Sequence, residues 1–200
     1  MKPEPCPHAE PDSPLTVWSL WHFQSMSDDW TQDNDELPHL LIGYFSSRAQ
    51  AEELQARIRN QPGLCEWPLG FRIGHEHPDQ SGAWERGFAG WWDDAASDVD
   101  VLDTLRLPEP PRRTSVLWDV WHFRLHDAAA PPDPLSAKGI GLFTSCANAE
   151  TAIAHHLRQP GFRDWPQGFR IFRRRLGVVF GVEGFRERYG WEAWRDSLRG

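Results

Sequence analysis

The stretch QPGLCEWPLGFRI at residues 61–73 returns almost unchanged as QPGFRDWPQGFRI at residues 159–171. Around these two peptides, residues 42–73 and 140–171 share 17 identical residues in 32 positions at a constant offset of 98. A match of this length and order indicates two copies of one unit, and a repeated unit sets the architecture of the chain.

Three strands are predicted in each copy. VWSLWHF at residues 17–23 and its match LWDVWHF at 117–123 have the aromatic and branched composition typical of strands. Asp119 of the second copy replaces Ser19 of the first, so we expect this position to face water. The other predicted strands are LLIGYFSS at 40–47 and GFRIG at 70–74 in the first copy, and GIGLFTS at 139–145 and GFRIF at 168–172 in the second.

One helix of roughly 13 residues is predicted in each copy, at residues 48–61 and 146–159. Ser47 and Ser145 are the expected N-caps, because Gln or Asn follows three residues later. After each helix, a Pro-Gly pair is expected to end it, with the glycine at positive φ, and Trp67 or Trp165 to act as an aromatic plug. The helical residues expected to be buried are Ala51, Leu54, Ile58, Ala149, Ile153 and Leu157.

The predicted fold class is α+β, a tandem repeat of two small β-β-α-β(-β) units that could pack as a pseudo-twofold body. The additional strand of the first unit would lie near WERGF, residues 84–88. The expected domains are a flexible N-terminal tail at 1–14, an acidic first unit at 15–90, an acidic and proline-containing linker at 91–115, and a second unit with a basic third strand at 116–200.

The order of these motifs resembles a small uncharacterised bacterial domain family, present here as a tandem duplication. Its pattern is W-x-L-x-H, I-G-x-Y-x-S, P-G-F, G-F-x-I and W-x-x-G-F. The second copy departs from the pattern at its end, where VVFGVEGF replaces SGAWERGF. The resemblance implies the boundaries of the unit and, by analogy, a role in immunity or partner binding. The residues that carry it are Trp18, Leu20, His22, Ile42, Gly43, Pro62, Gly63, Gly70, Phe71, Ile73, Trp84, Gly87 and Phe88.

Charge is distributed unevenly along the chain. The formal net charge is −8, but residues 1–100 carry −12 and residues 101–200 carry +4. The acidic first half disfavours general binding of nucleic acid or anionic membranes there. The chain is also rich in tryptophan, with 12 residues, and tryptophan is a frequent anchor of protein interfaces.

The cysteines and the N-terminal sequence indicate a cytoplasmic setting. Cys6, Cys65 and Cys146 share no metal-binding or redox spacing, so we expect reduced thiols. MKPEPCPHAEPDSPL at the N-terminus has no apolar segment of the kind found in signal peptides, and no run of 18 apolar residues follows. We therefore predict neither a signal peptide nor a membrane span.

No catalytic, cofactor or metal site is predicted. His75 and His77 alternate on a strand and could share a zinc or copper ion, but the spacing fixes no third ligand and the second copy has arginines there. His22 and His122 recur without a paired nucleophile or carboxylate, so we expect hydrogen-bonded structural histidines. The chain also lacks a phosphate-binding loop, G-x-S-x-G and H-E-x-x-H.

Two acidic runs contain large aromatic residues: DDWTQDNDE at 28–36 and WWDDAASDVD at 91–100. Acidic charge would steer a basic partner and tryptophan would anchor it. The leading hypothesis is a non-enzymatic protein-binding module, most concretely an immunity-type inhibitor that neutralises a bacterial toxin such as a basic nuclease. Its expected partner-binding residues are Asp28, Asp29, Trp30, Asp33, Asp35, Glu36, Trp91, Trp92, Asp93 and Asp94.

Two alternatives remain open at this point. One is nucleic-acid or nucleotide binding through the arginine-rich third strand of the second unit, with Arg170, Arg173, Arg174 and Arg175. The other is a small metal-dependent hydrolase built on His75 and His77. The sequence does not decide between monomer and dimer, or between one packed body and two separate lobes.

Overall fold

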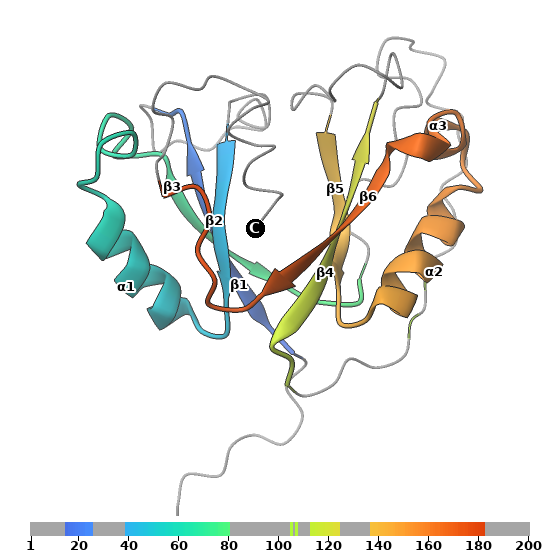
Figure 1. Cartoon of the computed structure of the whole chain (residues 1–200), viewed down its shortest axis with the longest axis horizontal. Helices are drawn as coiled ribbons and strands as arrows, with labels where there is room; N and C mark the ends of the chain where they lie inside the picture. Colours follow the sequence, from blue (N-terminus) through green and yellow to red (C-terminus); the bar gives the residue numbers. More distant parts are fainter. Residues whose placement is uncertain are drawn as a thin grey trace, which may run out of the picture.

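The computed structural model describes residues 15–25, 39–80, 105, 107, 113–124 and 137–182. It is a mixed α/β structure with two three-stranded antiparallel sheets and few helices (Figure 1). In chain order the elements are β1 (Val17–Phe23), β2 (His39–Phe45), α1 (Arg48–Ile58), β3 (Phe71–Glu76), β4 (Val116–Phe123), β5 (Ala137–Phe143), α2 (Cys146–His156), α3 (Pro160–Arg163), the 3-10 helix η4 (Pro166–Gly168) and β6 (Phe169–Arg175).

The two sheets have the same strand order, with the first strand of each in the centre. The orders are β2-β1-β3 and β5-β4-β6. Each central strand also has a register shift where it pairs with the strand that follows it in the chain. In the β1–β2 pair the shift comes after Leu20, and in the β4–β5 pair it comes at the corresponding place, after Val120. The six strands predicted from the sequence are therefore confirmed, with ends that differ by a few residues.

The elements form four layers: α1, the first sheet, the second sheet and α2 (Figure 1). One apolar cluster packs α1 against the first sheet, and another packs α2 and α3 against the second. A third cluster joins the two sheets to each other. Each sheet is therefore buried on both faces. The third cluster contains Val17, Leu41, Tyr44, Leu117 and Leu142.

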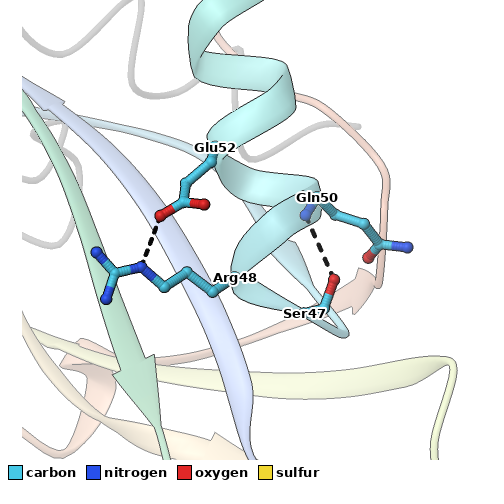
Figure 2. A network of polar contacts seen from close by, with 4 residues as sticks. All are labelled: Ser47, Arg48, Gln50 and Glu52. Atoms are coloured by element: carbon cyan, nitrogen blue, oxygen red, sulfur yellow. Dashed lines mark hydrogen bonds and ion pairs between the residues drawn. The ribbon is translucent and has the colours of Figure 1, made fainter.

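The helix starts follow the predicted capping. Ser47 Oγ accepts a hydrogen bond from the backbone nitrogen of Gln50 at 3.3 Å (Figure 2), and Ser145 Oγ accepts one from Asn148 at 3.0 Å. Figure 2 also shows the ion pair between Arg48 Nε and Glu52 Oε1 on the exposed side of α1, at 2.7 Å. Both serines are thus explained by helix capping.

The repeated peptide differs from its prediction in two respects. The side chains that fill the core are Leu64 and Phe162, both fully buried, whereas Trp67 and Trp165 are half-buried. Only the first copy has its glycine at positive φ, because Gly161 lies inside α3. In the first half, Gly63 makes the turn with a φ of 90°, and in the second half the short α3 makes it.

The buried face of α2 also differs from its prediction. The buried residues of α1 are Ala51, Leu54 and Ile58, as expected. On α2 they are Ala149, Ala152 and His156, while the expected Ile153 and Leu157 are half-buried. The helix is thus rotated relative to the predicted apolar stripe, and it places a histidine in the core.

Each half sends a short segment across to the other sheet. After β3, the backbone nitrogen of Asp79 donates to the carbonyl oxygen of Leu142 at 2.8 Å, and after β6 that of Gly177 donates to Tyr44 at 2.7 Å. Asp79 and Gly177 both have positive φ, 63° and 77°. Phe180 continues the second crossing along β2. The two sheets are therefore tied by backbone hydrogen bonds as well as by apolar packing.

Several predictions lie outside the described residues: the tail at 1–14, the fourth strand near 84–88 and most of the linker at 91–115. Among the residues that the structure does describe, no helix has both the length and the apolar composition needed to cross a membrane.

Candidate functional site

The recurring histidines hold the repeated peptide in place. His22 Nε2 lies 2.9 Å from the carbonyl oxygen of Trp67, and His122 Nε2 lies 2.9 Å from that of Trp165. Both histidines are fully buried. Because a carbonyl can only accept, each bond requires the proton on Nε2. The prediction of hydrogen-bonded structural histidines is confirmed.

Burial also sets the charge of these two histidines. It lowers the pKa of His122 to about 4, and it lowers the pKa of His22 in the same direction. In both, the hydrogen bond to the tryptophan carbonyl partly opposes the effect. Both rings are therefore neutral at neutral pH, and the single proton of each ring lies on Nε2, where it is donated to the tryptophan carbonyl.

A buried polar cluster lies between the two sheets. Position 119 was expected to face water, but Asp119 is 3% exposed and Ser19 is fully buried. This expectation was wrong because the sheet face that carries position 119 packs against the other sheet. Asp119 Oδ2 accepts a hydrogen bond from the hydroxyl of Tyr44 at 3.2 Å, and Oδ1 accepts one from Trp121 Nε1 at 2.8 Å.

Arg174 completes this cluster and is not part of an exposed basic patch. Its Nε lies 3.6 Å from Asp119 Oδ2, and its side chain is 4% exposed. The guanidinium also lies over the rings of Phe172 and Phe180, at 5.2 and 4.9 Å from their centroids. The nucleic-acid alternative therefore loses one of its four arginines.

The other three arginines of that alternative, Arg170, Arg173 and Arg175, are exposed. Arg170 donates from one guanidinium nitrogen to the carbonyl oxygens of Gln167 and Phe169, at 2.6 and 2.8 Å. Its orientation is therefore set by its own turn. Arg173 and Arg175 remain as exposed cations on β6.

Electrostatics couple the members of the buried cluster, Tyr44, Asp119, Trp121 and Arg174. Burial raises the pKa of Asp119, while Arg174 and the hydrogen bonds from Trp121 and Tyr44 act against this rise. Burial and the nearby Asp119 carboxylate raise the pKa of Tyr44 well above its ordinary value. Tyr44 comes from the first half and the other three from the second, so the cluster links the two sheets.

The sequence analysis missed this cluster, although a signal was present. The corresponding positions in the first half hold Ser19 and Glu76, and Ser19 Oγ donates to Glu76 Oε1 at 3.0 Å. Between the copies, Ser19 changes to Asp119 and Glu76 changes to Arg174. Two polar changes that preserve a polar pair on neighbouring strands indicate contact, which a position facing water would not require.

A second group of aromatic residues lies at another part of the junction. The rings of Trp21 and Trp121 lie 6.2 Å apart between their centroids, and both side chains are half-buried. Trp21 also lies 6.5 Å from Phe23 and 5.6 Å from His39. We call these four residues the Trp21–Trp121 group. The two tryptophans, which come from different halves, thus share one site.

All ten predicted partner-binding residues lie outside the described part of the chain. The covalent attachments of the first acidic run are nevertheless described. Residues 26–38 connect Ser25, just after β1, to His39, the first residue of β2 and a member of the Trp21–Trp121 group. The run that contains Asp28 to Glu36 is therefore joined to the chain next to the half-buried aromatic side chains of this group.

His75 and His77 lie at the end of β3 and are both exposed. Their ring centroids are 5.4 Å apart, and His75 lies 6.0 Å from Trp18. Within the described ranges, no group of three or more His, Cys, Asp and Glu side chains is placed to hold a metal ion.

Comparisons with known proteins give neither a family nor a relative for this chain. No protein-family model matches the chain, and neither curated proteins nor solved structures give a match.

Proposed function

We propose that this protein is a non-enzymatic protein-binding module, most concretely an immunity-type inhibitor that neutralises a bacterial toxin, such as a basic nuclease, in the cytoplasm. Its architecture would be two β-β-α-β copies packed as a pseudo-twofold body. The matching strand orders, the matching histidine bonds and the two reciprocal crossings support this architecture.

One observation carries the functional proposal. Trp21 and Trp121 meet at the junction of the two sheets with part of their surface accessible, and the acidic run 28–36 is attached beside them. Half-buried tryptophans supply large contact area at low entropic cost, and acidic charge accelerates encounter with a basic partner. The partner-binding face would combine the Trp21–Trp121 group with Asp28, Asp29, Trp30, Asp33, Asp35 and Glu36.

The second acidic run, with Trp91, Trp92, Asp93 and Asp94, would form an additional contact. It is attached to the chain away from the Trp21–Trp121 group, so it is not part of the face defined above. The side chains that could have suggested catalysis have structural contacts: the two recurring histidines bond to backbone carbonyls and the two serines cap helices.

The test is a pull-down from the native host with the tagged full-length chain, at low salt and again at about 0.5 M salt, where the screening length falls to a few ångströms. We expect one basic protein in near-equal amount at low salt, and less of it at high salt. Nucleic acid recovered at low salt and lost at high salt would instead favour the exposed Arg170, Arg173 and Arg175.

Charge reversal then tests the face itself. Changing Asp28, Asp29, Asp33 and Asp35 to lysine should slow association with the captured protein and weaken its salt dependence. The matched control reverses four exposed acids elsewhere, Glu52, Glu53, Glu150 and Asp164. Equal association rates for both variants would refute the assignment of the face.

A further inference from the structure

We propose that His75 and His77 form a surface site for a divalent transition-metal ion, with Cu²⁺ as the preferred ion. The pair is independent of the Trp21–Trp121 group, and the site would hold the metal through two imidazoles and water. Its occupant is defined by the ligand chemistry, because imidazole suits copper, nickel and zinc.

The separation of the two rings fits this assignment. A metal ion binds imidazole nitrogen at about 2.0–2.1 Å, so it lies about 3.2 Å from each ring centre. Two adjacent ligands of a square-planar Cu²⁺ place these centres about 4.5 Å apart, and a tetrahedral angle places them about 5 Å apart. The ring centroids of His75 and His77 are 5.4 Å apart. One ion can therefore bridge the two rings after small side-chain rotations.

The strand keeps the two histidines together. His75 belongs to β3, where it pairs with Trp18 of β1, and His77 follows the last residue of β3. Side chains two residues apart on a strand project to the same side. Pairing with the central strand thus fixes the backbone of His75 and of Glu76, the residue directly before His77, which reduces the conformational entropy lost when an ion binds.

The residue between them contributes negative charge without occupying the site. Glu76 Oε1 accepts a hydrogen bond from Ser19 Oγ at 3.0 Å, on the side of the strand opposite to the histidines. A carboxylate held next to two imidazoles favours a bound cation. In the second half the same positions are Arg173 and Arg175, which exclude a cation, so the proposed site belongs to the first half alone.

Copper is the most sensitive probe, because divalent affinity for a nitrogen site rises through Ni²⁺ to Cu²⁺ and falls at Zn²⁺. The experiment titrates the full-length protein with Cu²⁺ by calorimetry and records the electron paramagnetic resonance spectrum of the first equivalent. We expect one tightest equivalent whose spectrum shows coupling to two imidazole nitrogens. The chain has 9 histidines, so weaker equivalents are expected to follow it.

Three variants identify the ligands. His75→Ala with His77→Ala should remove the first equivalent, whereas His155→Ala, on α2, should leave it unchanged. Arg173→His with Arg175→His transplants the pair to β6 and should add a second equivalent, weaker than the first because Arg174 lies between the two positions in place of Glu76. Circular dichroism and thermal unfolding would establish that each variant is folded.

The proposal is overturned if the wild type shows no equivalent tighter than the rest, or if the double alanine variant binds the first equivalent as the wild type does. A transplanted pair that adds no equivalent would also overturn it, because the same strand geometry is then insufficient.

Discussion

The carboxylate of Asp79, which follows β3, lies 2.9 Å from the side-chain nitrogen of Asn148 in the first turn of α2. The same carboxylate accepts from the backbone nitrogen of Thr144 at 3.0 Å and from its hydroxyl at 2.6 Å. The first half therefore holds the start of a helix of the second half in place, next to its N-cap Ser145. In the first half, Gln50 accepts from Ser46 instead, and Gly177 takes the position that corresponds to Asp79.

Asp79→Ala should lower the free energy of unfolding by about 2–3 kcal/mol, since hydrogen bonds to a buried charged group are worth about 1.5–3 kcal/mol. Asp79→Gly removes the same bonds but tolerates the φ of 63°, so it should cost less than the alanine variant. Chemical denaturation would measure both changes. The control is Asp164→Ala, an exposed aspartate paired with Arg163 at 3.9 Å. A loss no larger than that of the control would contradict a stabilising role of the Asp79 contacts with Thr144 and Asn148.

The buried pair of Asp119 and Arg174 gives a second prediction. Arg174→Glu should destabilise the protein by about 3–5 kcal/mol, because it leaves a buried carboxylate without its cation and adds another acid. The double variant Asp119→Ser with Arg174→Glu copies the Ser19–Glu76 pair of the first half and should recover much of this loss. A double-mutant cycle measures the coupling. If the two losses simply add, the two positions do not interact as a pair.

Much of the fold could be predicted because local signals and tertiary structure agree. Both capping serines, the six strands and the buried face of α1 follow from composition and spacing. The face of α2 did not follow, because burial there is decided by packing against α3, which brings Phe162 next to His156 at 4.8 Å between ring centroids. Sequence periodicity carries no information about that contact.

The junction between the halves was the least predictable part. Alternation along β1 and β4 identifies two faces for each strand but does not show what covers each face. An acidic residue such as Asp119 is therefore predicted to face water, whereas it is buried against the other sheet. The reciprocal crossings at Asp79 and Gly177 join residues that are 63 and 133 apart in the chain. The only local signal of such long-range pairing is a residue with positive φ. The acidic run proposed to bind the partner lies outside the described residues.

The repeated peptide has a glycine, Gly70 or Gly168, at a position that leaves no room for a side chain. A Cβ atom added to either glycine would meet a backbone carbonyl oxygen, that of Phe23 at 1.9 Å or that of Phe123 at 2.0 Å. We expect Gly70→Ala and Gly168→Ala each to destabilise the protein by about 3 kcal/mol or more, because the backbone must move. Thermal unfolding would show this. Gly139→Ala is the control, since its Cβ would meet nothing closer than 4.0 Å; losses equal to the control would contradict the close approach.

His156 makes the stability of the protein depend on pH. Burial lowers the pKa of His156 and of His122 to about 4 from 6.5. The ring centroid of Phe162 lies 4.8 Å from that of His156 and 5.1 Å from that of His122. The unfolded chain then binds protons more readily than the folded one. The contribution of these histidines is complete above about pH 6.5 and is lost as the pH falls towards about 4. Burial of Asp119 raises its pKa and so acts in the opposite direction.

His156→Ile tests this dependence, because Ile58 occupies the corresponding position in the first half and is also buried. Comparing the variant with the wild type at each pH cancels the contribution of Asp119. Denaturant unfolding between pH 7 and pH 4 should show a smaller loss of stability in the variant, with a difference of up to about 3 kcal/mol from one histidine. Thr151→Ala, at an exposed position on the same helix, is the control and should leave the slope unchanged. Identical slopes for the wild type and His156→Ile would show that the buried imidazole does not control the acid response.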